Sequence, residues 1–151
     1  MKRGRVALAT RFMVTAMVLG VAGVASADPE HTCRDSMLNG LYVFTASGFG
    51  NVSPGPPQPQ AIVELIRFNG DGTVDVPGGR VSVNGLIFPI ISSGTYTTPT
   101  VVDKGCETTV TFDSPAHPAL YIFIPLHANT LQMILINSNT VFQGAATKVS
   151  N

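Results

Sequence analysis

The sequence lacks the motifs that mark several common classes of enzyme and binding protein. It contains no G-x-S-x-G motif, so nothing indicates the nucleophile elbow of a serine hydrolase. It contains no C-x-x-C motif, and its three histidines, His31, His117 and His127, do not have the short spacing of metal ligands. After residue 27, no cluster of Lys and Arg offers a surface to nucleic acid or anionic lipid. The sequence therefore predicts no metal, no cofactor and no nucleic-acid partner, and it leaves open whether the protein is an enzyme.

The N-terminal segment, residues 1–27, has the organisation of a secretory signal peptide. It begins with three basic residues within the first five positions, continues with an apolar stretch over 12–24, and ends in Ala25-Ser26-Ala27, a small-residue cleavage pattern. We predict cleavage after Ala27 and a secreted or periplasmic protein without membrane contact. The alternative is a retained membrane anchor, although the apolar stretch is shorter than the ~20 residues of a spanning helix.

Cleavage would change the charge balance of the chain. It would remove four of the nine basic residues and none of the nine carboxylates, which leaves a net charge of −4. The remaining region, residues 28–151, has a length typical of one domain with a core of its own.

Cys33 and Cys106 are the only cysteines in the sequence. Export would place both in an oxidising compartment, where such a pair indicates a disulfide. The bond would close a loop of about 74 residues, for which the chain-entropy model gives a stabilisation on the order of 4 kcal/mol. A redox or metal-binding pair is the alternative, and the long spacing does not favour it.

A short helical segment is predicted directly before the first strand. Thr32 is a candidate cap, Asp35 stands three residues further on as in a capping box, and Asn39-Gly40 is a stop signal. This predicts one or two helical turns with Met37 and Leu38 packed inward.

From Gly40 onward the sequence is typical of short β-strands separated by turns. Asn69-Gly70-Asp71-Gly72 is a strong hairpin signal. The segment 50–59 contains four prolines, which cannot donate to a ladder, and so predicts an exposed loop. The predicted strands are 41–47, 60–68, 73–76, 80–83, 86–91, 95–102, 107–112, 119–126, 130–137 and 140–149.

This succession of strands predicts an all-β fold, either an antiparallel barrel or a sandwich. We favour a single antiparallel β-barrel of about eight strands, because meander connections dominate and closure removes exposed sheet edges. An outer-membrane barrel is the alternative for an exported chain, but it needs regular strands of about ten residues. Prolines that shorten the strands favour a soluble barrel; they are Pro77, Pro89, Pro99, Pro115, Pro118 and Pro125.

Three stretches of the sequence carry a family resemblance. They are Cys33 followed by Leu38-Asn39-Gly40-Leu41-Tyr42, then Phe68-Asn69-Gly70-Asp71-Gly72, and Ser93-Gly94-Thr95-Tyr96-Thr97 leading to Cys106. Together with the closing Gly144-Ala145-Ala146-Thr147, they resemble small exported bacterial β-barrel proteins of unknown function. Those proteins are similar in architecture to the barrel of allene oxide cyclases and, more loosely, to lipocalin-like calycins.

The resemblance implies an eight-stranded barrel whose interior can hold one apolar molecule. It does not imply cyclase activity, because function does not follow from a fold. No cyclase active-site motif is present, and the G-x-W signature of lipocalins is absent because the chain has no Trp.

Glu64 is the ionisable residue of greatest interest. In the predicted strand 60–68 it shares one face with Phe68, so both point into the barrel if either does. A carboxyl among apolar groups would have a raised pKa, which suits a general acid or a polar handle in a ligand pocket. The alternatives are a solvated Glu64 on the outer face and a structural ion pair with Arg67 or Arg80.

Tyr42, Tyr96 and Tyr121 could line the same cavity, where each phenol would offer an apolar ring and one polar group. The alternative is that they are ordinary barrel core.

These observations predict a protein that binds a small apolar or amphipathic ligand inside the barrel. The candidate ligand-binding residues are Glu64, Tyr42, Tyr96, Tyr121 and Phe68. Two alternatives belong to other classes: a cofactor-free isomerase or cyclase that uses the cavity, and a structural or surface-interaction module with a filled core.

Overall fold

The structure is a computed structural model that describes residues 32–51, 55–114 and 118–151. The predicted signal peptide, His31 and His117 lie outside the described residues. The elements are η1 (Asp35–Met37), β1 (Asn39–Asn51), β2 (Pro57–Asn69), β3 (Thr73–Val83), β4 (Leu86–Tyr96), β5 (Thr100–Val102), β6 (Gly105–Phe112), β7 (Ala119–Pro125), β8 (Thr130–Leu135) and β9 (Val141–Ser150).

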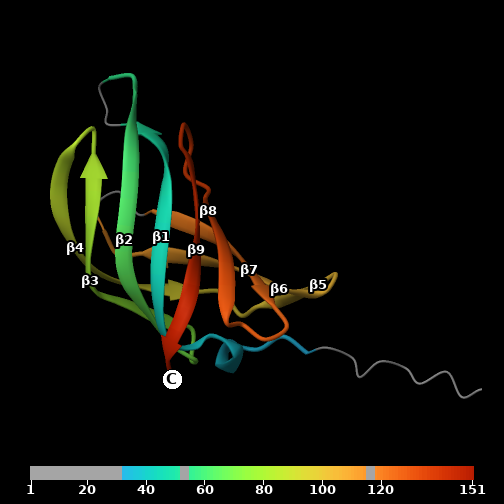
Figure 1. Cartoon of the computed structure of the whole chain (residues 1–151). Helices are drawn as coiled ribbons and strands as arrows, with labels where there is room; N and C mark the ends of the chain where they lie inside the picture. Colours follow the sequence, from blue (N-terminus) through green and yellow to red (C-terminus); the bar gives the residue numbers. More distant parts are fainter. Residues whose placement is uncertain (1–31, 52–54, 115–117) are drawn as a thin grey trace, which may run out of the picture.

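Eight of the strands form a closed antiparallel barrel (Figure 1). Neighbouring strands follow the order β4-β3-β2-β1-β9-β8-β7-β6, and a pairing between β4 and β6 closes the cylinder. This closing pairing is short, because it joins only Gly94–Tyr96 to Val110–Phe112. The extra strand β5 pairs with the other end of β6. The predicted all-β barrel of about eight strands is confirmed.

The half of the barrel next to η1 is filled with side chains. Tyr42, Phe68 and Tyr96 meet there in edge-to-face contacts, with ring centroids 5.5 Å and 5.7 Å apart. Each such aromatic pair contributes about 1 kcal/mol beyond the burial of its area. Leu38, which follows η1, is fully buried below these rings. This end of the barrel is therefore a packed core.

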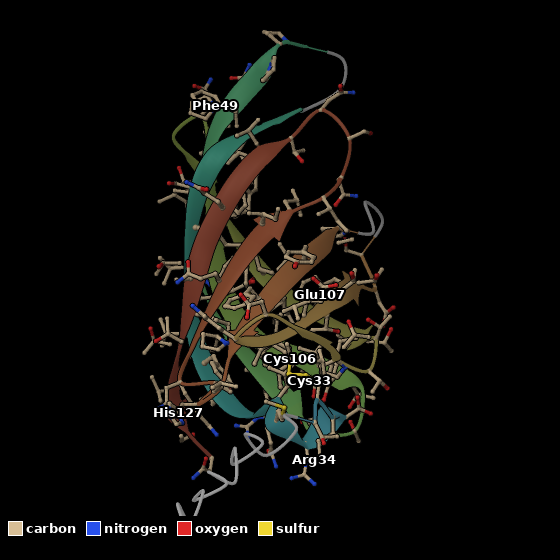
Figure 2. All side chains as sticks on the ribbon, turned by 90° about the vertical axis from the view of Figure 1, so that its right-hand side faces the viewer. Cys33, Arg34, Phe49, Cys106, Glu107 and His127 are labelled. Atoms are coloured by element: carbon tan, nitrogen blue, oxygen red, sulfur yellow. A yellow bond between two sulfur atoms is a disulfide. The ribbon has the colours of Figure 1, made fainter. Side chains whose placement is uncertain are left out.

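A disulfide between Cys33 and Cys106 ties the N-terminal segment to β6 at the same end of the barrel (Figure 2). The two Cα atoms are 5.9 Å apart, and the residues are separated by 73 positions. The predicted disulfide is confirmed. It closes most of the folded chain into one loop, for which the chain-entropy model gives about 4 kcal/mol.

The helical segment is shorter than predicted. It is a single 3-10 turn, its N-cap is Arg34 rather than Thr32, and no side chain caps it. Met37 packs against the core and Leu38 is fully buried, as predicted. The disulfide at Cys33 and the first strand at Asn39 leave too few residues between them for an α-helix. No helix in the part of the chain that the structure describes is long and apolar enough to cross a membrane.

The proline-rich segment does not form the long loop that the sequence predicts. The β1–β2 hairpin extends to the pairs Phe49↔Pro59 and Asn51↔Pro57. The Pro59 carbonyl accepts a hydrogen bond from the Asn84 N–H at 2.9 Å, so the Pro59 nitrogen faces the same side, away from β1. Because β3 ends before this point, the missing N–H removes no ladder hydrogen bond.

Two further strand boundaries differ from prediction. β3 runs through Pro77-Gly78 as one strand, because a register irregularity between Val76 and Gly79 absorbs the proline. β4 continues through Ser93-Gly94 to Tyr96, so that the predicted strand 95–102 is divided between β4 and β5.

Candidate functional site

A cavity of about 310 Å³ occupies the half of the barrel opposite the disulfide. Its lining includes the parts of β2, β3 and β4 near the β3–β4 hairpin, and core residues of β1, β6, β7 and β9 close it toward the filled half. The lining is mainly apolar and comprises Phe44, Gln60, Ile62, Glu64, Val76, Val81, Pro89, Ile90, Ile91, Ser92, Phe112, Ser114, Pro118, Leu120, Leu135 and Phe142. This volume and composition are at the small end of the range for small-molecule sites.

The cavity lies beside the short pairing between β4 and β6. The β4 segment Pro89–Ser92 lines the cavity but lies beyond Gly94, where the ladder with β6 ends. One backbone hydrogen bond, from the Asp113 N–H to the Ser93 carbonyl at 2.8 Å, extends the junction, and Ser114 and Pro118 line the cavity next to it. The tip of the β3–β4 hairpin next to it carries exposed apolar side chains.

Glu64 lies on the inner face of β2 and is 6% exposed. It faces Phe44 on β1 and Gly79 on β3 across the ladders. A Cβ atom built on Gly79 would lie 2.4 Å from the Glu64 Cβ, so no larger residue fits there without displacement. Gly79 thus allows β3 to pass close to the backbone of Glu64.

Burial raises the pKa of the Glu64 carboxyl from 4.5 to about 7. Within the described residues, no hydrogen bond or ion pair to this carboxyl accompanies the burial. Arg67 and Arg80 are exposed, and Arg80 lies opposite Val63 on the outer face. The alternatives of a solvated Glu64 and of an ion pair with either arginine are therefore wrong. A carboxyl near its midpoint at neutral pH could accept or donate a proton, or hydrogen-bond a ligand.

Instead of lining the cavity as predicted, Tyr42, Tyr96 and Phe68 lie in the filled half of the barrel. The Tyr42 hydroxyl donates a hydrogen bond to the Ala128 carbonyl at 2.9 Å, and burial raises the Tyr42 pKa to about 12. The Tyr96 hydroxyl donates to the Asp35 carbonyl at 3.1 Å. These tyrosines hold the N-terminal turn and the turn before β8 against the core.

Tyr121 lies on the outer face of β7, so the prediction that it lines the cavity is wrong. Its neighbours along the strand, Leu120 and Ile122, are the buried residues. The Tyr121 hydroxyl donates a hydrogen bond to the Glu107 carboxylate, also on the outer face.

Several cavity residues were not singled out from the sequence. Ile62 could have been, because it shares a strand face with Glu64. Val81, Ile90 and Phe142 come from other strands and reach the cavity only through the register of the sheet.

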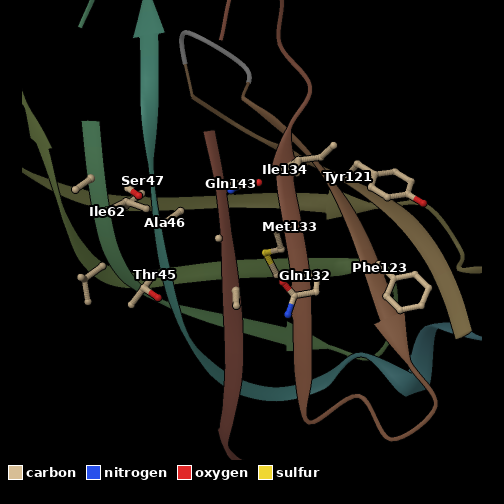
Figure 3. A pocket seen from close by; sticks show the side chains of 14 residues that line it. Thr45, Ala46, Ser47, Ile62, Tyr121, Phe123, Gln132, Met133, Ile134 and Gln143 are labelled. Atoms are coloured by element: carbon tan, nitrogen blue, oxygen red, sulfur yellow. The ribbon is translucent and has the colours of Figure 1, made fainter. Parts of the chain in front are cut away.

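A second concavity, an open groove of about 790 Å³, crosses the outer face of β2, β1, β9, β8 and β7 (Figure 3). Its lining includes small side chains such as Ser47 and Ala145, and Tyr121 and Phe123 stand at one side. The lining holds no charged residue, and its threonine, serine and glutamine side chains are exposed. The interior cavity is the better candidate site, because its carboxyl is buried without a described partner.

The described residues contain no group of three or more His, Cys, Asp or Glu side chains placed to hold a metal ion. Asp71, for example, has a structural role in the β2–β3 turn. Its carboxylate accepts hydrogen bonds from the Thr73 N–H at 3.0 Å and from the Thr73 hydroxyl at 2.6 Å.

Comparisons with known proteins concern the fold. No family model matches the chain, and no curated protein matches it. A solved structure of a redesigned β-barrel named mFAP1, bound to DFHBI, is similar to this chain with a TM-score of 0.47 and 15% sequence identity. The similarity covers 78% of this chain and 100% of that one. The function must therefore be inferred from the cavity itself.

Proposed function

We propose that this protein binds one small apolar or amphipathic molecule in the barrel cavity, with Glu64 as its polar anchor. The observation that carries the proposal is the Glu64 carboxyl, which is 6% exposed and faces an apolar cavity. Burying a carboxyl without a partner costs stability, and a ligand that hydrogen-bonds to it would recover part of that cost.

The energetics favour a ligand that combines apolar surface with one polar group. Burial of about 200 Å² of apolar ligand surface contributes about 5 kcal/mol. Association costs on the order of 4 kcal/mol or more. Apolar contact alone therefore gives weak binding. A hydrogen bond to the carboxyl adds about 2 kcal/mol to the binding free energy and so contributes a large part of the affinity.

The proposal is tested with an apolar fluorescent probe and two matched variants. Val81→Phe would place a larger side chain in the cavity, whereas Val63→Phe makes the same change on the outer face of the neighbouring strand. We expect Val81→Phe to lose probe binding and Val63→Phe to retain it, with both variants folded by circular dichroism. Equal probe binding by the two variants would place the probe elsewhere.

Native mass spectrometry of protein purified from its own producer is the complementary experiment. Binding predicts a co-purified small molecule that is absent from Val81→Phe. If no molecule co-purifies and no probe binds, the protein is a structural or interaction module, the third of the functions predicted from the sequence.

A second candidate function, a cofactor-free isomerase or cyclase, is favoured by the Glu64 pKa of about 7. A carboxyl with this pKa suits general acid–base catalysis at neutral pH. Glu64→Gln separates the two functions. It would abolish turnover by an acid–base enzyme but leave a binding protein able to hold an apolar probe.

We also propose that the protein works outside the cytoplasm, after removal of residues 1–27. The Cys33–Cys106 disulfide supports this location, because such bonds persist in oxidising compartments. Mass spectrometry of the exported protein should give the mass of residues 28–151 with the disulfide intact. Recovery of the intact chain from the membrane fraction would contradict cleavage.

A further inference from the structure

We infer that the ligand is a long-chain aliphatic amine, whose ammonium head lies against Glu64 and whose tail runs outward along the β3–β4 hairpin. The inference rests on the proposed function and names the ligand class of the same cavity. It is carried by the position of the buried carboxyl, by the neutral lining around it and by the exposed apolar residues beyond it.

The carboxyl lies two cross-strand rows inward from the tip of the β3–β4 hairpin. Three cross-strand rows run from the interior to the hairpin tip, and each joins β2, β3 and β4. From the inside outward, the rows are Glu64–Gly79–Ile90, Ile62–Val81–Phe88 and Gln60–Val83–Leu86. Alternate residues along a strand are about 7 Å apart, so the rows extend over about 14 Å. A ligand that enters from the hairpin tip and is anchored at Glu64 therefore enters with its polar end first.

The surroundings of Glu64 determine which polar end fits. Among the described residues, Glu64 is the only charged or titratable side chain that lines the cavity: no Lys, Arg, His or second acidic residue is part of the lining. Phe44, Val76 and Phe142 are among the apolar side chains that replace them. An ionised carboxylate only accepts hydrogen bonds, so it attracts a donor and repels a second carboxylate. A fatty acid is thus disfavoured, and a protonated amine is favoured.

Folding has already buried most of the Glu64 side chain. A buried ion pair is commonly weak because both charges must lose their hydration on pairing. Here the unliganded protein already carries the cost for the carboxylate, which is 6% exposed and has no described partner. An incoming ammonium needs to lose only its own hydration, and the charge-assisted hydrogen bond is about twice as strong as a neutral one.

The β3–β4 hairpin supplies a surface for the tail. Leu86 is 67% exposed and Phe88 is 47% exposed, and both lie on the strand face that carries Ile90 into the cavity. An alkyl chain that leaves the cavity would cover these side chains, whose exposure to water is unfavourable in the empty protein. The tail thus joins the cavity and the exposed hairpin into one site.

The head group is tested with decylamine, 1-decanol and decanoate, which have the same chain length. Binding is measured at pH 8 by calorimetry and by displacement of the apolar probe, on the full mature protein with its disulfide intact. At this pH Glu64, with a pKa of about 7, is mainly ionised, and an alkylamine remains protonated. We expect decylamine to bind about tenfold more tightly than decanol, and decanoate to bind most weakly.

The role of the Glu64 carboxylate is tested with two variants that each replace a carboxylate by an amide. Glu64→Gln should remove the preference for the amine, whereas Asp103→Asn, in the exposed turn after β5, should preserve it. Decanoate binding as tightly as decylamine, or an amine preference that survives in Glu64→Gln, would overturn the inference while the proposed function stands. If neither the probe nor any of the three compounds binds, the proposed function itself fails.

The direction of the tail is tested on the two faces of the hairpin. Leu86→Ser should weaken decylamine binding and leave butylamine binding unchanged, because only the longer chain reaches the outermost row, Gln60–Val83–Leu86. Ile87→Ser changes an exposed residue opposite Ser82 on the outer face and should affect neither amine. Equal losses from the two substitutions would show that the tail does not follow the inner face.

Discussion

Gly79 and Glu64 face each other across the β2–β3 ladder so closely that a Cβ on Gly79 would lie 2.4 Å from the Cβ of Glu64. The Cβ added on Gly79 would also lie 2.9 Å from the Cα of Glu64. Glycine at position 79 is therefore part of the site, although it has no side chain to contact a ligand. The adjacent Gly78 has open space around an added Cβ. The two glycines offer a matched pair of substitutions.

Gly79→Ala should destabilise the protein and weaken probe binding, because the new methyl group forces β3 away from β2 at the cavity. Overpacking of this kind costs about 1–3 kcal/mol. Gly78→Ala should have little effect on either property, since nothing lies within 4 Å of the added atom. Urea denaturation and probe titration of both variants check this. Equal effects would mean that the contact with Glu64 does not matter.

Glu64 should make the protein less stable as the pH rises. Its pKa is about 7 in the folded protein and 4.5 ordinarily, so the folded state binds the proton more tightly. The free energy of unfolding therefore falls between about pH 4.5 and pH 7, by on the order of 3 kcal/mol. Glu64→Gln removes this titration. Urea denaturation should show Glu64→Gln gaining stability relative to the wild type across this window, and a pH-independent difference would contradict a buried carboxyl.

Loss of the Cys33–Cys106 disulfide should lower the free energy of unfolding. The bond joins residues 73 positions apart. The chain-entropy model gives a loss of about 4 kcal/mol on removing it. Urea denaturation of the Cys33→Ser/Cys106→Ala double variant measures this loss, and wild-type protein under reducing conditions should match it. An unchanged urea midpoint would contradict the prediction and would mean that the disulfide does not reduce the conformational entropy of the unfolded chain.

Tyr42→Phe should lower stability but not ligand affinity. The substitution leaves the Ala128 carbonyl without the hydrogen bond that Tyr42 donates at 2.9 Å in a buried setting. The expected loss is about 1–2 kcal/mol. Tyr121→Phe removes a hydrogen bond on the outer face and should cost less. Reduced probe affinity in Tyr42→Phe would mean that the filled half of the barrel takes part in binding.

Strand alternation predicted that Glu64 and Phe68 share a face but left open whether that face is the inner one, and the succession of strands and turns predicted the barrel. On β2, Arg67 and Glu64 fall on opposite faces, and Phe68 marks the inner one. The turn chemistry of Asn69-Gly70-Asp71-Gly72 correctly located the hairpin that follows, where Gly70 and Gly72 have φ angles of 76° and 91°. The pairing of two cysteines was also readable, because no other partner exists in the sequence.

Alternation failed on β7 for a physical reason. Leu120 and Ile122 are apolar on one face, and Tyr121 and Phe123 are equally apolar on the other. Composition cannot tell inside from outside in such a strand, so Tyr121 was assigned to the wrong face. A cavity inside the barrel was predicted, but the half of the barrel that holds it was not, because its lining comes together only through the long-range register of the sheet.

The unequal lengths of the strand pairings give the cylinder a seam. β1 and β2 pair without interruption from Asn39 to Asn51, whereas the ladder between β4 and β6 covers only Gly94–Tyr96, with one further backbone hydrogen bond at each end, at Ser93 and at Thr97. Amide hydrogens along this short junction should exchange with solvent sooner than those of the β1–β2 hairpin, because fewer bonds must break to release them. Parting of the strands there would widen the interior while the disulfide-tied base stays shut. We therefore expect the cylinder to open at this seam before the β1–β2 hairpin separates.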